Sequence, residues 1–425
     1  MKEYRDCSRE ELISELEVIK ARYSEFCLRD LNLTMARGNP CSKQMDLSAE
    51  MFNMVSNSLG YLNESGIDCR NYGGLDGLHE LKVIFADMMD VEPSQVIVGG
   101  NSSLNMMFDT VAQFMTHGSY EGATPWLLQK DIKFLCPSPG YDRHFKICEH
   151  FGIKMITIPM REDGPDMAEI EKYISDPTVK GMWCVPKYAN PTGVVYSDEI
   201  IEKIASMKPA ADDFRILWDN AYCVHHLTED EITIPNLIET AKKYGNEDMV
   251  IKFASTSKIT FPGAGVAAVA ASAKNVTFLK KRMSFQTIGP DKLNQLRHAR
   301  MFRSIDDIRV HMRKHAEILR PKFAMVLDHF NKELKGLGIA EWTNPKGGYF
   351  ISLDVMSGCA KRVVELCKNA GVVLTGAGAT YPYGIDPEDS NIRVAPTYPS
   401  LSELAAASEL LCIAVKYAAL EKMIG

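Results

Sequence analysis

The feature that most constrains this chain is the regular alternation of apolar, strand-like runs with helical stretches between about residues 80 and 300. The runs cover residues 95–98, 133–136, 154–158, 181–185, 215–218, 249–253 and 266–271. Strands that alternate with helices favour a sheet of parallel neighbours with helices on both faces. We therefore predict an α/β fold whose larger part is a mainly parallel seven-stranded sheet. The sheet need not be wholly parallel, because the last two runs lie close together.

A change of character after about residue 305 indicates a second, smaller α/β domain. A long helical pattern covers residues 305–337, shorter strand-like runs follow at 349–353, 372–375 and 391–394, and a last helix is expected at 402–422. We predict three parts: an N-terminal segment, residues 1–60, that packs on the small domain, a large domain, residues 61–304, and a small C-terminal domain, residues 305–425.

The N-terminal segment carries helix signals and then loses them. Ser8 followed by Glu11 fits a capping box that opens a helix, and apolar residues continue at helical spacing to Tyr23. Residues 35–47 are interrupted by Gly38 and Pro40, so we expect this stretch to be extended.

Charge and composition exclude several classes of protein. The formal net charge is −7, so the chain lacks the excess of basic residues that is typical of a nucleic-acid binder. No apolar run reaches the length of about 18 residues that a membrane span needs. The 11 cysteines are scattered without a C-x-x-C pair, and the adjacent His225-His226 would point to opposite faces of a strand, so we expect neither a disulfide framework nor a metal site. With no secretory signal at the N-terminus, we expect a soluble cytoplasmic protein.

Three polar groups stand at predicted strand ends, where open α/β sheets usually carry their chemistry. Asn190 opens an Asn-Pro turn, Asp219 ends the run at 215–218 with Tyr222 three residues on, and Lys258 follows small hydroxyl residues. A lysine in such a place can have a lowered pKa and form a Schiff base. Each group also has an ordinary interpretation when taken alone: a turn, a helix N-cap and a surface lysine.

Arg393 is the fourth group and lies in a strand between apolar residues. A guanidinium in that setting is costly unless it binds a carboxylate. That carboxylate belongs either to a substrate or to the protein itself, as an internal salt bridge.

Taken in their order along the chain, these groups resemble the fold-type I pyridoxal-phosphate (PLP) aminotransferases, and the resemblance runs from about residue 31 to the end. The segments YGGLDGL at 72–78, GNSS at 100–103, PGY at 139–141 and KGGYF at 346–350 are similar to family motifs. Together with ARGNP at 36–40 and the tail after Arg393, they resemble a divergent subgroup of aspartate aminotransferases related to MocR-type proteins.

The resemblance implies a role for each group. Lys258 would hold PLP as a Schiff base and move a proton between the substrate Cα and the cofactor, while Asp219 would keep the pyridine nitrogen protonated. The other implied roles are hydrogen bonds to the phenolic oxygen from Asn190 and Tyr222, stacking by Tyr141, phosphate binding by Ser102, Ser103, Ser255 and Tyr72 of the partner subunit, and a clamp on the substrate α-carboxylate by Arg393.

One position departs from the family pattern. Val266 stands where the family commonly carries a phosphate-binding arginine eight residues after the lysine. Another cation should compensate, and a dicarboxylic substrate needs a cation for its second carboxylate. The candidates for these two tasks are Arg37 beside Gly38, Arg143 and Lys187.

The resemblance implies a homodimer with shared active sites that moves an amino group between aspartate or glutamate and a 2-oxo acid, such as 2-oxoglutarate or oxaloacetate. The fold alone does not select the reaction. The alternatives are an aromatic or aminoadipate transaminase, a β-lyase, a decarboxylase, or an aminotransferase-like ligand sensor of a regulator, which the acidic charge disfavours.

Overall fold

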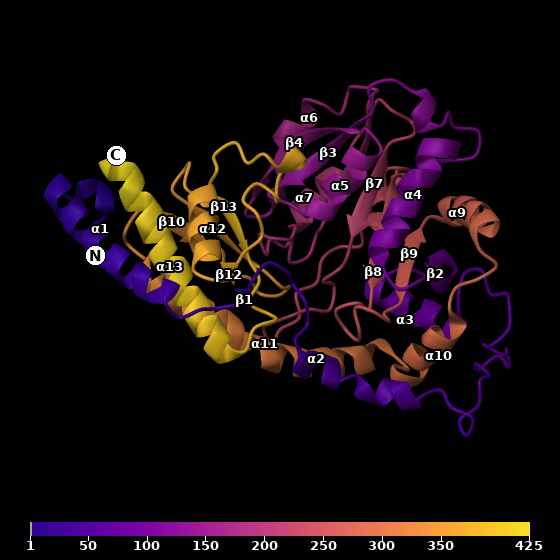
Figure 1. Cartoon of the computed structure of the whole chain (residues 1–425). Helices are drawn as coiled ribbons and strands as arrows, with labels where there is room; N and C mark the ends of the chain where they lie inside the picture. Colours follow the sequence, from indigo (N-terminus) through magenta and orange to yellow (C-terminus); the bar gives the residue numbers. More distant parts are fainter. Residues whose placement is uncertain (1) are drawn as a thin grey trace.

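A mixed sheet of eight strands forms the centre of the larger lobe in the computed structural model, which describes residues 2–425 (Figure 1). Its strand order is β2-β9-β8-β7-β6-β3-β4-β5. The strands are β2 (Val96–Val98), β3 (Lys133–Ser138), β4 (Lys154–Arg161), β5 (Gly164–Pro165), β6 (Val179–Cys184), β7 (Arg215–Asp219), β8 (Val250–Ser255) and β9 (Ala267–Ala271). Strands β8, β7, β6, β3 and β4 are parallel neighbours, so their carboxyl ends meet at one edge.

All seven predicted runs are strands, but the prediction of a seven-stranded sheet was one strand short. The eighth strand, β5, has two residues and pairs antiparallel with β4. Its Gly-Pro sequence carries no strand signal, because glycine and proline are typical of turns. Strand β9 is antiparallel to both β8 and β2, which agrees with the expectation that the last two runs need not be parallel.

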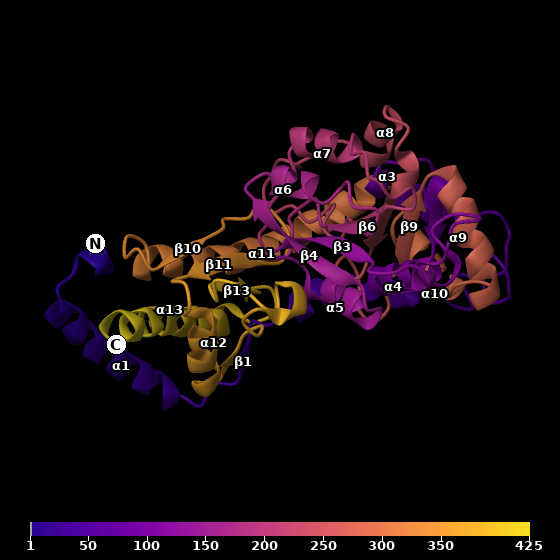
Figure 2. The same cartoon turned by 90° about the horizontal axis from the view of Figure 1, so that it is seen from above.

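Helices cover both faces of the large sheet. Apolar residues of α4, α5 and α9 pack on one face, and those of α3, α6, α7, α8 and the first part of α11 (Ile305–Glu333) pack on the other. Figure 2 shows α7 and α8 on the side of the sheet opposite to α4 and α5. The helices of this lobe are α3 (His79–Met89), α4 (Ser103–His117), α5 (Asp142–His150), α6 (Met167–Glu171), α7 (Asp198–Ala205), α8 (Leu237–Lys242), α9 (Ala273–Gln286) and α10 (Lys292–Met301).

The smaller lobe is built on an antiparallel sheet of three strands in the order β10-β11-β13. Helix α11 (Ile305–Glu333) starts at a capping box on Ser304 and extends from the large sheet into this lobe, as Figure 1 shows. The other elements are β10 (Ala340–Trp342), β11 (Ile351–Val355), α12 (Ala360–Asn369), β12 (Val372–Val373), β13 (Asn391–Val394) and α13 (Leu401–Ile424).

The N-terminal segment joins the smaller lobe through α1 (Arg9–Cys27). The predicted capping box between Ser8 and Glu11 is present, and α1 shares one apolar core with α13. Strand β1 (Leu33–Thr34) then pairs with β12. The prediction that residues 35–47 are extended was wrong for α2 (Ser42–Asp46), because the Gln44 side chain accepts a hydrogen bond from the Cys41 N–H at 3.1 Å and caps a short helix.

Short 3-10 helices complete the described chain: η1 (Tyr4–Asp6), η2 (Ala49–Asn53), η3 (Pro93–Gln95), η4 (Trp126–Leu128), η5 (Glu247–Met249) and η6 (Pro382–Gly384). Among residues 2–425, no helix has both the length and the apolar character that a membrane crossing requires.

The division into segments 1–60, 61–304 and 305–425 stays a proposal.

The crossing of the N-terminal segment over β12 generates a test of this architecture. Gly371 has φ +84°, and a Cβ built on it would lie 1.9 Å from the Leu31 carbonyl oxygen. We expect Gly371→Ala to lower the free energy of unfolding by about 2–5 kcal/mol, because backbone strain and a backbone clash add. Gly152→Ala is the matched control, since its φ is +69° but nothing lies within 4 Å of the new Cβ. Equal thermal midpoints for the two variants would contradict the placement of residue 31.

Candidate active site

The carboxyl ends of the parallel strands open into a cavity of about 210 Å³. Strand β7 supplies Asp219, the loop after β8 supplies Lys258, and the loop after β6 supplies Asn190. The structure thus brings together most of the site residues that the sequence predicted, namely Ser102, Ser103, Tyr141, Asn190, Asp219, Tyr222, Ser255 and Lys258.

Asp219 is a buried carboxylate with one oxygen held and one oxygen free. Its Oδ2 lies 3.1 Å from the His144 Nε2, and the His144 ring stacks on Trp183 at 4.3 Å between centroids. Its Oδ1 has no hydrogen-bond partner in the described structure. A buried unpaired carboxylate oxygen is costly, so this atom is an acceptor that is available to a donor in the cavity.

The amine of Lys258 faces the same cavity and is easier to deprotonate than an ordinary lysine. Burial lowers the pKa of Lys258, the negative charge of Asp219 opposes that change, and the positive charge of Arg393 adds to it. The amine lies 5.0 Å from the ring centroid of Tyr222 and 5.8 Å from that of Tyr349. Burial also raises the pKa of the Tyr222 hydroxyl well above its usual value, so Tyr222 stays protonated and is able to donate a hydrogen bond.

Small hydroxyl residues line the opposite end of the cavity at the N-terminus of α4. Ser102 is the N-cap residue, but its side chain makes no capping hydrogen bond. Ser103 and Ser255 line the same cavity. Free backbone N–H groups and hydroxyls at a helix N-terminus bind phosphate well. Val266 lies buried beside this region, and its N–H donates to the Thr256 Oγ1 at 2.9 Å.

Arg393 lies on β13 at the border of the two lobes, and it forms the internal salt bridge that was one of its two interpretations. Its Nη1 donates to the Asp142 Oδ1 at 2.8 Å and to the Asn190 Oδ1 at 3.3 Å, and its Nη2 donates to the Thr375 Oγ1 at 3.3 Å. The guanidinium lies over the Phe350 ring at 4.9 Å. Its buried Nε has no partner among the described residues, so the guanidinium retains capacity for a further carboxylate.

A buried polar network behind Lys258 was not predicted. The Tyr349 hydroxyl lies 3.4 Å from the Lys258 carbonyl oxygen and accepts a hydrogen bond from the Gln44 Nε2 at 2.9 Å. The His225 Nε2 lies 3.3 Å from the Lys258 carbonyl oxygen, and the His311 Nε2 lies 2.9 Å from the Ile259 carbonyl oxygen. His315 contacts both His311 and Gln44. The spacing of His311 and His315 on one helix face was the available signal. The network fixes the backbone that carries Lys258.

His144 is the other residue that sequence analysis did not select as part of the site. It lies three residues after the PGY segment at 139–141. Nothing in the sequence shows that α5 (Asp142–His150) turns this side chain onto β7, because that contact joins residues 75 positions apart.

Six predicted site residues do not line the cavity, and Arg393, described above, is one of them. Arg37 and Arg143 are exposed near Arg393: Gly38 abuts Phe350, and Arg143 neighbours Asp142. Tyr72 is 84% exposed. Placing Lys187 beside the substrate was wrong, because its buried ammonium donates to the Cys223 carbonyl oxygen at 2.8 Å inside a different cavity.

Comparison with known proteins agrees with this geometry. The chain matches the family described as aspartate amino-transferase over residues 7–425. It is 44% identical to an aspartate aminotransferase of Corynebacterium glutamicum, over 95% of this chain and 94% of the relative. A crystal structure of an aspartate transaminase from the same organism superposes with a TM-score of 0.95 at 43% identity, over 98% of each chain.

More distant structures share the fold alone. An α-aminoadipate aminotransferase from Thermus thermophilus, solved with a phosphopyridoxyl-leucine compound, superposes with a TM-score of 0.74 at 19% identity, over 94% of this chain and 95% of the other.

The charges around Lys258 generate a prediction with a defined sign. In the protein without cofactor, Asp219→Asn should lower the pKa of Lys258 further, because it removes a negative charge that stabilises the ammonium. Arg393→Met should raise that pKa, because it removes a repelling positive charge. The measurement is the pH dependence of acetylation at Lys258, read by peptide mass spectrometry.

Lys154 is the internal control for this experiment, since its contact with Asp131 raises the pKa of Lys154. Lys258 should become reactive at lower pH than Lys154. Shifts of the same sign in both variants, or a reactivity midpoint for Lys258 at or above that of Lys154, would show that these charges do not act on it as described.

Proposed function

The chain belongs to the aspartate amino-transferase family and is an aminotransferase, and we propose that it moves an amino group between aspartate or glutamate and a 2-oxo acid with PLP as cofactor. The observation that carries the proposal is the meeting of the Lys258 amine and the unpartnered Asp219 Oδ1 in one cavity. These are the two groups that a PLP enzyme needs on opposite ends of the cofactor ring.

The residues of the cavity fit this cofactor in three respects. The free Asp219 Oδ1 offers an acceptor for a protonated ring nitrogen, and the Lys258 amine has a lowered pKa, as an amine that binds an aldehyde requires. The uncapped Ser102 at the start of α4 offers a phosphate site. The side chains present in the cavity therefore support PLP as the cofactor.

The bound cofactor would supply an electron sink for the carbanion that forms at the substrate Cα. Lys258 would hold it covalently and then carry the Cα proton on Nζ. Asp219 would keep the ring nitrogen protonated, and His144 would orient that carboxylate through the contact at 3.1 Å. The stack of His144 on Trp183 limits the rotation of the imidazole, so Asp219 keeps a fixed direction.

The remaining residues would position the ring. Tyr222 would donate to the phenolic oxygen, and Asn190 would donate through its amide nitrogen, since its Oδ1 already accepts from Arg393. Tyr141, the N-cap residue of α5, lines the cavity and would cover one ring face. Ser102, Ser103 and Ser255 would bind the phosphate.

Arg393 would bind the substrate α-carboxylate by exchanging its internal partner. Asp142 is partly exposed, with 26% of its side chain accessible, whereas the Arg393 side chain is 8% exposed. Asp142 therefore has water to move into, and the guanidinium does not. A substrate carboxylate in its place would receive two parallel N–H bonds from the guanidinium, a geometry that arginine favours.

Arg37 and Arg143 remain the candidates for reading a second carboxylate or for neutralising the phosphate. Arg37 precedes Gly38, which abuts Phe350, and Arg143 follows Asp142, which accepts a hydrogen bond from Arg393. Because Arg393 itself lies over Phe350, both positions are near Arg393, which supports the substrate role for these two arginines. Lys187 is withdrawn from this set, because its ammonium faces another cavity.

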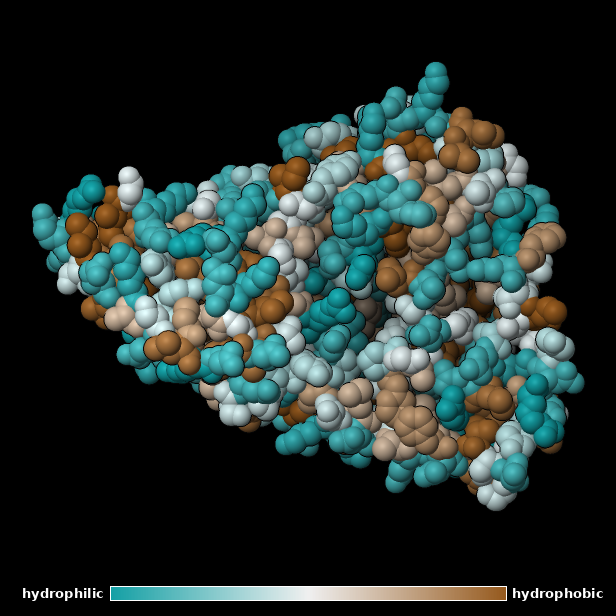
Figure 3. Space-filling model, viewed as in Figure 1, coloured by the Kyte–Doolittle hydropathy of each residue, from teal (hydrophilic) through white to brown (hydrophobic). Residues whose placement is uncertain are grey.

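A homodimer with shared sites is the proposed assembly. Large apolar side chains are exposed before α3 and in or just after the last turn of α9, among them Phe52, Leu59, Ile67, Phe285 and Ile288. Figure 3 shows hydrophobic residues in the lower right of the molecule, where Figure 1 places the segment that precedes α3. Exposed apolar clusters of this kind mark association surfaces, and Tyr72 lies in the same segment.

The substrate proposal predicts a kinetic separation. With 2-oxoglutarate as acceptor, the wild type should use aspartate far better than alanine. An Arg37→Ala or Arg143→Ala variant that removes the side-chain contact should lose about 1.5–3 kcal/mol of transition-state binding for aspartate and little for alanine. Arg161→Ala, at an exposed arginine of β4 paired with Asp166, should change neither. A wild type that prefers alanine would overturn the dicarboxylate proposal.

The assembly proposal predicts a defect in cofactor retention. Tyr72→Phe removes one hydroxyl from a side chain that is 84% exposed in the single chain, so it should leave folding intact. If that hydroxyl reaches the phosphate of the partner subunit, the variant should release PLP faster during dialysis while it sediments as a dimer. Tyr244→Phe, at another exposed tyrosine, is the control. A wild-type chain that is monomeric and fully active would refute the shared site.

A further inference from the structure

A second cavity, of about 320 Å³, lies behind the active-site strands. Side chains alternate in direction along a strand, so Asp219 faces the active site while Trp218 and Asn220 face this second cavity. Lys252 pairs with Trp218 across β7 and β8 and points the same way. The two cavities therefore share one strand end as a wall but open on different sides of it.

Two buried lysines enter this cavity without a carboxylate partner in the described structure. Lys187 is 7% exposed and donates to the Cys223 carbonyl oxygen at 2.8 Å. Lys252 is 3% exposed and donates to the Met89 carbonyl oxygen and to the Asn236 Oδ1 at 3.2 Å. By contrast, the buried Lys180 has an ion pair with Asp213 at 2.6 Å. Each ammonium has three donors, so both retain donors for another acceptor.

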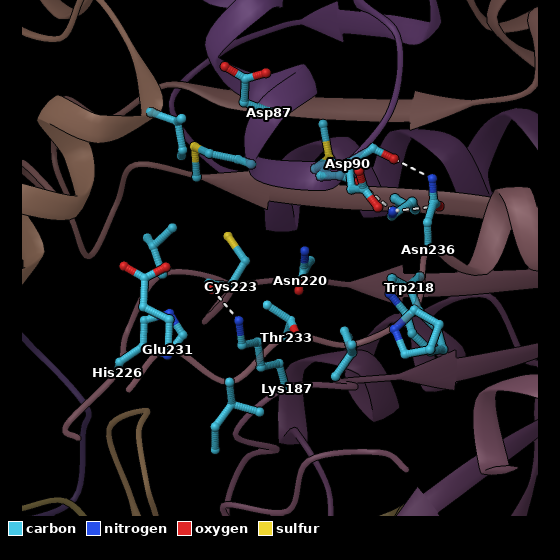
Figure 4. A pocket seen from close by; sticks show the side chains of 18 of the residues that line it. Asp87, Asp90, Lys187, Trp218, Asn220, Cys223, His226, Glu231, Thr233 and Asn236 are labelled. Atoms are coloured by element: carbon cyan, nitrogen blue, oxygen red, sulfur yellow. Dashed lines mark hydrogen bonds between the residues drawn. The ribbon is translucent and has the colours of Figure 1, made fainter. Parts of the chain in front are cut away.

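Asn220 adds a buried polar group with unused hydrogen-bonding capacity. It is 7% exposed, it lines the cavity, and its Oδ1 has no partner among the described residues. Figure 4 shows Asn220 and the Cys223 region between Lys187 on one side and Asp90 with Asn236 on the other. Buried amides without partners are uncommon and indicate a missing ligand or water.

The charges are separated between the floor and the mouth of the cavity. The acidic residues that line it, Asp87, Asp90 and Glu231, are all exposed. Glu231 is also engaged by Arg309, at 3.3 Å. The buried part of the lining therefore carries the two ammonium groups and no carboxylate, which favours an anion at the floor.

Part of the lining is apolar, although His226, Thr233 and Arg309 also line the cavity. Met88, Val224, Ile232 and Ile234 contribute aliphatic surface to the same cavity. An inorganic anion has no apolar surface to bury against these side chains, whereas an organic anion would bury its carbon skeleton there. A cavity of this volume is at the lower end of the range for small-molecule sites.

We propose that this cavity is a binding site for a small organic carboxylate, with the carboxylate on one of the two buried ammonium groups, Lys187 or Lys252, and the apolar body against the Met88–Ile234 side. Asn220 would donate to the carboxylate through its amide nitrogen, whereas its unpaired Oδ1 is an acceptor. The inference does not depend on the proposed substrate, because no residue of this cavity holds the cofactor or binds the amino acid in that mechanism.

The lowered pKa values of the two lysines agree with ammonium groups that have no anion beside them. Burial lowers the pKa of Lys187, and it lowers the pKa of Lys252 to about 8. A bound carboxylate would stabilise the ammonium group that it contacts and raise the pKa of that lysine.

The experiment uses 4-bromobenzoate as the probe, because its bromine can be located by anomalous scattering and its ring matches the apolar wall. Crystals of the PLP-loaded enzyme are soaked with the probe, and the dissociation constant is measured by calorimetry in solution. We expect a bromine peak beside Met88 and Ile234 with the carboxylate on Lys187 or on Lys252. Binding at the active site through Arg393 is told apart by the position of the peak.

The variants are Lys252→Met and Lys187→Met, and the one that removes the ammonium group found on the carboxylate in the crystal should weaken this binding at least about tenfold. Lys322→Met is the matched control, since Lys322 is also buried and bonded only to carbonyl oxygens but lies in α11 outside the cavity. The wild-type soak needs no variant, so misfolding cannot obscure the result. A probe found only at Arg393, no measurable binding in solution, or equal weakening by Lys322→Met would overturn the proposal.

Discussion

The parallel pairing of β7 with β8 decides where the reactive groups of this protein stand. The register sets Asp219 opposite Phe253, so the loop after β8 carries Lys258 to the carboxyl-terminal edge beside that carboxylate. Burial at this edge lowers the pKa of the lysine and leaves one carboxylate oxygen unpaired. The alternation of side chains along the same strand gives its other face to the second cavity. One pairing of strands thus places two polar sites back to back.

The large and small lobes meet at this edge through Arg393. This arginine lies on β13 of the small lobe, while Asp142 and Asn190, which accept its hydrogen bonds, belong to the large lobe. The exchange of Asp142 for a substrate carboxylate would replace an ion pair between lobes by one that includes the substrate. The network of Gln44, Tyr349 and the α11 histidines holds Lys258 from the small-lobe side, so both lobes contribute to one site.

Much of this arrangement could be predicted from the sequence, because strand runs and the order of Asn190, Asp219 and Lys258 are local patterns. Two of the misses share one physical cause, which is long-range contact. The pairing of β5 with β4 and the packing of His144 on β7 depend on tertiary structure that no local signal encodes. Lys187 was misplaced because it follows the end of β6, where the alternation that fixes side-chain direction in a strand no longer applies.

The central claim is that Lys258 is the amine that holds the cofactor. The structure contains a second buried lysine that could be expected to react with an aldehyde. Lys252 lies on the preceding strand, is also buried, and has a pKa lowered to about 8. The direct measurement is borohydride reduction of the PLP-loaded protein, followed by peptide mapping of the pyridoxyl label. The account predicts the label on Lys258 alone, and its loss in Lys258→Ala. A label on Lys252, or covalent PLP that survives Lys258→Ala, would contradict it.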